Sequence, residues 1–167
     1  MKRIISVTVI VLAGLALIVA MFLYWKREQW APAFGGANIS VQLADTARYQ
    51  QNDPRWANFH LGNPNTETLA KAGCTGSSVA MAMTNLGVPY DPGQLSSALT
   101  TEDGFTPRGL LKWDGISRVT KGKIRVDVHS APSLDKLDAC LTRGDYPIVK
   151  FLIGGIVPHW VVVVGKH

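Results

Sequence analysis

The sequence contains Gly73-Cys74 directly ahead of a run of small residues and, far downstream, the stretch His159-Trp160-Val161-Val162-Val163-Val164-Gly165. These two stretches predict the helix and the strand on which the expected fold depends. A helix is predicted over residues 74–86, ended by Gly87, so that the Cys74 thiol lies at a helix N-terminus, where the helix dipole favours the thiolate. The valines after His159 predict a strand. A cysteine and a histidine that meet only in the folded chain are the minimum for a nucleophile and its base.

Helix caps and hydrophobic periodicity predict the other elements. Asp91 before Pro92 marks the start of a short helix, and Thr106-Pro107 gives the same signal. Ser133 and Gly144 are expected to begin and end a third helix between them. Strands are expected from alternation or valine content in three places: residues 124–128, 146–153 and 159–165. The last two predict a hairpin around the loop 154–158, and the unbroken valines predict a strand buried on both faces.

The N-terminal region has no charged residue between Ile4 and Trp25. At about 1.5 Å per residue this run would span roughly 33 Å, enough for a bilayer, so we expect a transmembrane signal anchor over residues 1–25. The alternative is a cleaved signal peptide, for which Ala31-Pro32-Ala33 has a suitable pattern but lies well beyond the run. We expect a linker over residues 26–46, broken by Gly35-Gly36, and a domain on the extracytoplasmic side of the cell membrane.

Composition argues against several function classes. The net charge is +5, and the basic residues are scattered, so nothing favours nucleic-acid binding. His60, His129 and His167 are widely spaced and show no metal-ligand pattern. The glycine pairs lack the following helix start that is typical of a phosphate-binding loop. We therefore expect no metal and no cofactor, and the sequence leaves the oligomeric state open.

The chain contains two cysteines, Cys74 and Cys140. In an exported domain they could form a disulfide, which is the alternative to a nucleophilic role for Cys74. Cys140 lies beside Leu141 on a stripe that Leu134 and Leu137 continue at helical spacing. This pattern favours a plain buried cysteine at position 140.

Several motifs occur in one order along the chain. They are Tyr49-x-Gln51-x-Asp53-x-Arg55-Trp56, Leu61-Gly62, Gly73-Cys74 with Ser78-x-x-Met81, Leu86-Gly87, and His159-Trp160-Val161-Val162-Val163-x-Gly165. Together they resemble the C39-like cysteine peptidases, bacterial papain-fold domains that are often exported, over residues 49–165. The resemblance implies an α+β, papain-like cysteine peptidase fold over residues 47–167. An N-terminal helical part would precede an antiparallel sheet, and the one transmembrane helix would precede both.

The same resemblance implies roles for single residues. Cys74 matches the family's nucleophile, His159 its general base, and Gln51 a glutamine that donates to an oxyanion, with the Cys74 backbone N–H as the second donor. Gln51 could instead be a surface glutamine in a turn, and Gln50 is a competing candidate. Three further residues are expected to build the domain, as a turn cap, an ion pair and a core aromatic: Asp53, Arg55 and Trp56.

In the family, the histidine strand leads to further strands with an aspartate that orients the histidine. This sequence stops at Lys166-His167, so the resemblance implies a domain truncated at its C-terminus. The site would then be a Cys–His dyad, or another group such as Asp145 would orient His159. The expected function is hydrolysis of peptide amide bonds through a thioester at the cell surface, with peptides, including cell-wall peptides, as substrates. The alternative is a catalytically inactive papain-like module that binds a peptide or a partner protein.

Overall fold

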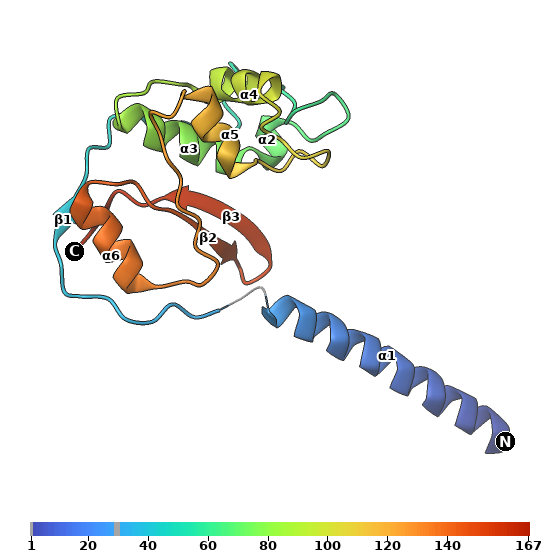
Figure 1. Cartoon of the computed structure of the whole chain (residues 1–167). Helices are drawn as coiled ribbons and strands as arrows, with labels where there is room; N and C mark the ends of the chain where they lie inside the picture. Colours follow the sequence, from blue (N-terminus) through green and yellow to red (C-terminus); the bar gives the residue numbers. More distant parts are fainter. Residues whose placement is uncertain (1, 29–30) are drawn as a thin grey trace. The chain divides into compact units, whose positions relative to one another are not determined.

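The computed structural model describes the backbone of residues 2–28 and 31–167 and the side chains of residues 11–24 and 31–167 (Figure 1). The chain divides into two compact units, Met1–Phe34 and Gly35–His167. The described residues form an α+β chain with six helices and with four strands paired into two small antiparallel sheets.

Unit 1 contains α1 (Lys2–Glu28). The prediction of a transmembrane helix is wrong, because no helix within the described residues is both long and apolar enough to cross a membrane. The ends of the apolar run, Ile4 and Trp25, lie outside the residues whose side chains are described. The fold class is therefore α+β, and no membrane-spanning helix is found among the described residues.

Unit 2 contains two parts, and its first part is helical. The helices are α2 (Leu69–Ala72), α3 (Cys74–Asn85), α4 (Pro92–Thr101) and α5 (Trp113–Val119), which Figure 1 shows gathered at one end of the unit. Their apolar faces meet in one buried core, to which each large side chain contributes about 1.5–3 kcal/mol of burial free energy. The largest of these side chains are Trp56, Leu69, Met83, Leu95, Leu99 and Ile116.

Two helix starts confirm the predictions from capping residues. Asp91 caps α4 in a capping box, in which its side chain accepts from Gln94 N–H at 2.8 Å and Gln94 Oε1 accepts from Asp91 N–H at 3.1 Å. Ser133 caps α6 (Leu134–Arg143), and Gly144 ends this helix at a positive φ of 85°. Local hydrogen bonds thus suffice to start and stop these helices.

The prediction of a helix start at Thr106-Pro107 is wrong. Thr106 instead closes a turn, with its N–H donating to Leu110 O at 2.8 Å and its hydroxyl accepting from Leu110 N–H at 3.0 Å. Gly109 leaves the helical region with a φ of 76°. Helix α5 therefore begins only at Trp113.

The second part of unit 2 contains the strands and α6. Strands β2 (Ile148–Ile153) and β3 (Val157–Val162) form an antiparallel hairpin with Phe151 opposite His159. The hairpin confirms the prediction, although β3 begins two residues before His159. Gly154 and Gly155 make the tight turn at φ of 59° and 75°, values that glycine adopts without strain.

Two expectations about strands are wrong. Residues 124–128 form no strand, since they pair with no other strand in the described structure, and Val128 is 64% exposed. The valines at positions 161–164 are half-buried rather than buried on both faces. A strand is buried on both faces when helix layers cover both sides of its sheet. Here the sheet has only two strands, and a helix packs against one of them, so less of the strand surface is covered.

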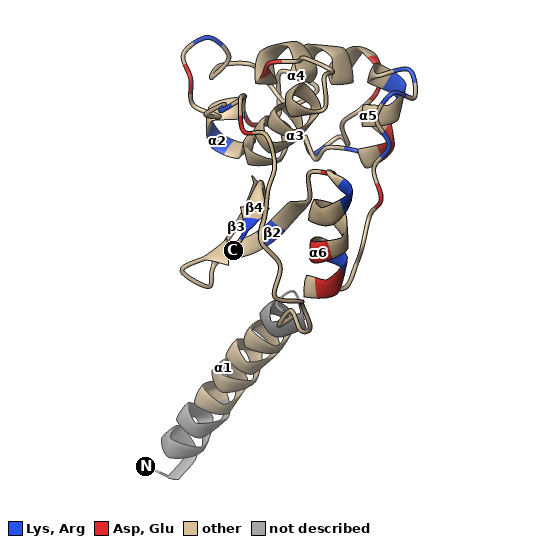
Figure 2. Ribbon diagram, turned by 90° about the vertical axis from the view of Figure 1, so that its left-hand side faces the viewer, with Lys and Arg blue, Asp and Glu red and all other residues tan. Residues whose placement is uncertain are grey.

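Residues 35–46, which the sequence assigns to a linker, lie within unit 2. Strand β1 (Val41–Gln42) pairs with β4 (Gly165–Lys166). Ahead of it, Ala37 N–H donates to the Asp138 carboxylate of α6 at 2.6 Å. The Lys166 ammonium contacts the same carboxylate at 2.8 Å and holds the pKa of Asp138 below its usual range. Figure 2 shows charged residues of both signs on α6, whereas α3 carries none.

Candidate functional site

A cleft of about 620 Å³ is lined by α3, by β3 and by the loop over residues 45–52. All three site residues that the sequence singles out line this cleft: Cys74, His159 and Gln51. They come from three separate segments of the chain. Gln50, the competing glutamine, lines it as well.

Cys74 is the first residue of α3, and its thiol is free and half-buried. Its N–H is among the first amides of the helix, which have no acceptor within α3. The first turn contains no acidic residue that would oppose a thiolate. Gly73, between α2 and α3, is buried, and a Cβ there would collide with Leu69 O. The glycine thus allows the tight junction that sets the start of α3.

Gln51 is held by one strong contact. Its Nε2 donates to Ala70 O at 2.8 Å, and the residue is half-buried. A primary amide has two N–H donors, so this bond fixes the side chain and leaves one donor for a ligand. Gln50 is exposed, and its contact is through the backbone, where its C=O accepts from Trp56 Nε1 at 2.8 Å.

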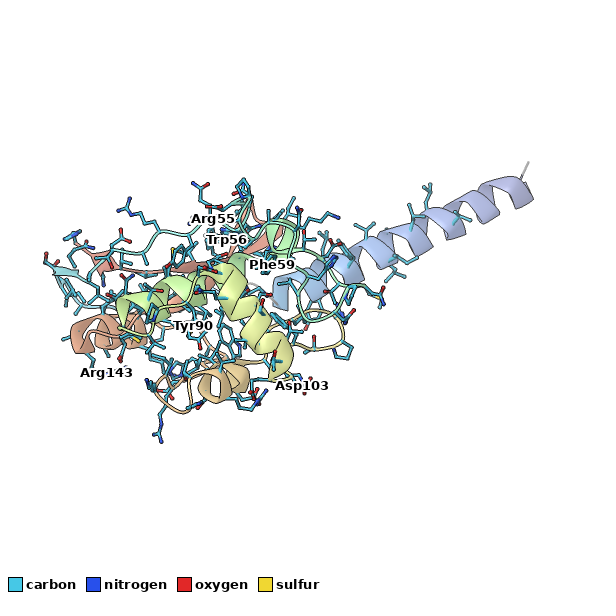
Figure 3. The ribbon with its side chains drawn as sticks, turned by 90° about the horizontal axis from the view of Figure 1, so that it is seen from above. Arg55, Trp56, Phe59, Tyr90, Asp103 and Arg143 are labelled. Carbon is cyan, nitrogen blue, oxygen red and sulfur yellow. The ribbon has the colours of Figure 1, made fainter. Side chains whose placement is uncertain are left out.

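The loop that carries Gln51 is fixed by its neighbours, which confirms the structural roles predicted for them. Asp53 Oδ2 accepts from Arg55 Nη2 at 2.7 Å, and hydrogen bonds from Arg55 lower the pKa of Asp53 to about 2. The Arg55 guanidinium lies over the ring of Trp56, 4.4 Å from its centroid, and Trp56 is only 2% exposed in the core. The two residues are labelled next to each other in Figure 3. The turn, the ion pair and the aromatic anchor together set the position of Gln51.

His159 lies on β3, and its half-buried ring packs edge-on against Phe151 with centroids 5.7 Å apart. The next residue along the strand joins the two sides of the cleft. Trp160 O accepts from Ser78 Oγ at 3.1 Å, and the Trp160 indole packs on Trp113 of α5 at 5.5 Å. The strand that carries the imidazole is therefore tied to the helix that carries the thiol.

No described residue forms a hydrogen bond with either ring nitrogen of His159, and none joins it to Cys74. Asp145 does not orient this imidazole in the structure, because its carboxylate accepts from Arg143 Nε at 2.9 Å. Catalytic hydrogen bonds are often long in a ligand-free site and tighten when substrate binds. The structure therefore places the two groups in one cleft without a preformed pair.

Cys140 occupies a different environment, on α6. It is free and half-buried, so the two cysteines do not form the disulfide that was the alternative for Cys74. Burial raises the pKa of the Cys140 thiol, and the negative charge of Asp145 adds to this effect.

Three polar residues that line the cleft were not singled out from the sequence: Asp45, Asn52 and Ser77. Ser77 is 4% exposed, and its hydroxyl has no partner among the described residues. Ser77 follows Cys74 by three residues, so both lie on one face of the helix. This spacing could have indicated from the sequence that Ser77 lines the same cleft. Asp45 and Asn52 come from loops, where no periodicity indicates which side chain faces a cleft. The described residues contain no cluster of three or more His, Cys, Asp or Glu that could hold a metal ion.

Comparisons of the chain with protein-family models, with curated proteins and with solved structures each find no significant match.

Proposed function

We propose that this chain is a cysteine peptidase of the C39-like kind, with Cys74 as nucleophile, His159 as general base and Gln51 as oxyanion donor. The observation that supports this most is the shared cleft: a thiol at a helix N-terminus, an imidazole and an anchored amide donor line one cavity. Such a set fulfils the three requirements of acyl transfer through a thiol.

The chemistry follows from these groups. His159 takes the proton of the Cys74 thiol, and the sulfur attacks the carbonyl carbon of a peptide bond. The negative charge on the carbonyl oxygen is stabilised by Gln51 Nε2–H and the Cys74 N–H. The carbon–nitrogen bond then breaks, the amine leaves with the proton from His159, and a thioester remains. Water, deprotonated by His159, attacks the thioester, releasing the carboxylic acid and the thiol.

The lining of the cleft supports a peptide as the substrate. Met81 on α3 and Val161, Val162 and Val164 on the strand side give it an apolar wall, while Asp45 and Asn52 give it a polar rim. An apolar surface with a few polar groups suits the mixed character of a peptide chain. Peptides of the cell wall fall within this class.

A second candidate is a peptide-binding module without catalysis. The observation in its favour is that no described residue hydrogen-bonds the ring of His159. An imidazole without an orienting partner loses much of the rate that a correct tautomer supplies. The cleft would then bind the same class of peptide and release it intact.

Alkylation separates the two candidates. A catalytic Cys74 reacts with iodoacetamide at neutral pH faster than Cys140 does, and mass spectrometry of the digested protein reports each thiol. The full chain then also hydrolyses a mixture of fluorogenic peptides, and Cys74→Ala does not. Binding of the peptides without hydrolysis, with equal alkylation of both thiols, supports the binding module and contradicts the peptidase.

A further inference from the structure

Ser77 is a buried serine of α3 whose hydroxyl has no hydrogen-bond partner among the described residues. The residue is 4% exposed, and it lines the cleft together with Cys74. A buried hydroxyl without a partner costs stability, so such groups are rare in folded proteins. A catalytic role is one reason for which a protein retains such a group.

Other hydroxyls in the helices are satisfied within the structure. In α4 and in α6, a threonine hydroxyl donates at 2.8 Å to the carbonyl four residues earlier. Ser78, the next residue of α3, donates to Trp160 O at 3.1 Å. The Ser77 hydroxyl makes neither kind of contact, although Gly73 O, four residues earlier, accepts the Ser77 N–H at 2.9 Å.

The sulfur of Cys74 is an acceptor within reach of this hydroxyl. Residues three apart on a helix lie on one face, with their Cβ atoms about 5–6 Å apart. That spacing leaves room for one side-chain atom on each residue, so a change of rotamer is enough for an O–H···S contact. A neutral thiol is a weak acceptor, and Ser77 and Cys74 form no hydrogen bond in the structure. A thiolate is charged and therefore accepts a much stronger hydrogen bond.

We propose that the Ser77 hydroxyl donates a hydrogen bond to the Cys74 sulfur when that thiol loses its proton. His159 takes the thiol proton, and Ser77 keeps its own, so the step needs no further group. The contact stabilises the charged sulfur before it attacks a carbonyl and again when it leaves the thioester. This inference rests on the proposed function for the reaction that the sulfur carries out.

The charges around the cleft are unchanged by a substitution at Ser77. Besides Cys74, the titratable side chains that line the cleft are Asp45, Tyr49 and His159. They lie on the loop over residues 45–52 and on β3, and Arg48 forms an ion pair with Asp45. Serine and alanine are both neutral, so the effect of Ser77→Ala on Cys74 reports the hydroxyl itself.

Alkylation of Cys74 at two pH values tests the contact. The full chain carries Cys140→Ala, and the rate with iodoacetamide is measured with and without Ser77→Ala. At pH 7 we expect Ser77→Ala to slow the reaction about fivefold, because the thiolate has lost a hydrogen-bond donor. At about pH 10, where an ordinary cysteine is deprotonated without help, we expect a difference of less than about twofold. Equal rates at pH 7, or an equal loss at both pH values, overturn the proposal.

Thermal unfolding separates the proposed contact from a packing role. Alanine is a better helix former than serine, and the Ser77 hydroxyl has no partner to lose. We therefore expect Ser77→Ala to unfold at the same temperature as the wild type or higher. Ser78→Ala is the matched control, because it removes a buried hydroxyl that donates to Trp160 O, and it should unfold a few degrees lower. A larger drop in Ser77→Ala than in Ser78→Ala contradicts the proposal.

These outcomes are independent of the proposed function. A chain that shows the pH-dependent loss but no hydrolysis that requires Cys74 retains the Ser77 contact and refutes the peptidase. A chain whose peptide hydrolysis requires Cys74, but whose alkylation is unchanged by Ser77→Ala, retains the peptidase and refutes the contact.

Discussion

Cys74 and Cys140 are both free, half-buried thiols on helices, yet the structure gives them opposite settings. Cys74 begins α3, with no acidic residue in its first turn, whereas Cys140 lies in the last turn of α6 beside Asp145. The positive end of a helix dipole favours a thiolate and the negative end disfavours it. Helix position and nearby charge, rather than exposure, therefore separate the candidate nucleophile from the structural cysteine.

Removing each thiol in turn should give the largest difference between the two cysteines, measured as the rate of peptide hydrolysis. We expect Cys74→Ala to lower peptide hydrolysis about a thousandfold or more, because no other group in the cleft can form the thioester. Cys140→Ala should retain the wild-type rate to within about twofold, since Cys140 lies outside the cleft. Initial rates on a fluorogenic peptide mixture measure both. Similar losses in the two variants would falsify the assignment of Cys74 as nucleophile.

His159→Ala should reduce the difference between the alkylation rates of the two thiols. We expect the alkylation rate of Cys74 by iodoacetamide at pH 7 to fall roughly 10- to 100-fold, because the base that takes its proton is lost. Cys140 should react as before, and it serves as an internal reference in the same digest. His60→Ala, outside the cleft, is the matched control. If both histidine variants leave Cys74 unchanged, His159 is not its base.

Gln51→Ala should separate the chemistry of the thiol from that of the oxyanion. We expect kcat for peptide hydrolysis to fall about a hundredfold, the usual effect of losing one oxyanion donor. Alkylation of Cys74 by iodoacetamide forms no oxyanion and should change little. Gln50→Ala provides the comparison, with a small effect on both measurements. A larger loss of hydrolysis in Gln50→Ala than in Gln51→Ala would exchange the roles of the two glutamines.

The smallest effect is expected at Cys140. The charge of Asp145 contributes to the raised pKa of this thiol, so Asp145→Asn should lower that pKa toward the value of a free cysteine. A larger thiolate fraction at pH 8 should then speed alkylation of Cys140 a few-fold. Cys74 should be unaffected, because Asp145 pairs with Arg143 and not with His159. A change in the Cys74 rate instead would mean that Asp145 acts on the cleft.

The sequence predicted those parts of the fold that depend on neighbouring residues. Asp91 and Ser133 start helices through hydrogen bonds to amides three residues away, and Gly154-Gly155 makes its turn without help from other segments. Residues 124–128 have the alternation of a strand but no pairing partner, which only the folded chain reveals. Strand β1 has two residues and therefore shows no periodicity at all.

The same division applies to the candidate site. Cys74 and His159 were predicted because each stands beside a run of residues that indicates a regular element: small residues after Cys74 and valines after His159. The anchoring of Gln51 by Ala70 O depends on a contact between segments that are separate in the sequence. The transmembrane helix was predicted from apolar composition alone, and no helix among the described residues qualifies as a membrane span.

Alkylation of Cys74 with and without His159 tests whether the thiol and the imidazole act as a pair. The rate with iodoacetamide is measured from pH 5 to pH 9 in the Cys140→Ala background, with and without His159→Ala. We expect the rate of Cys74 alkylation to fall at least about tenfold in the His159→Ala variant, because the base that takes the thiol proton is lost. Identical alkylation rates in the two proteins across this range would contradict the pairing of Cys74 with His159.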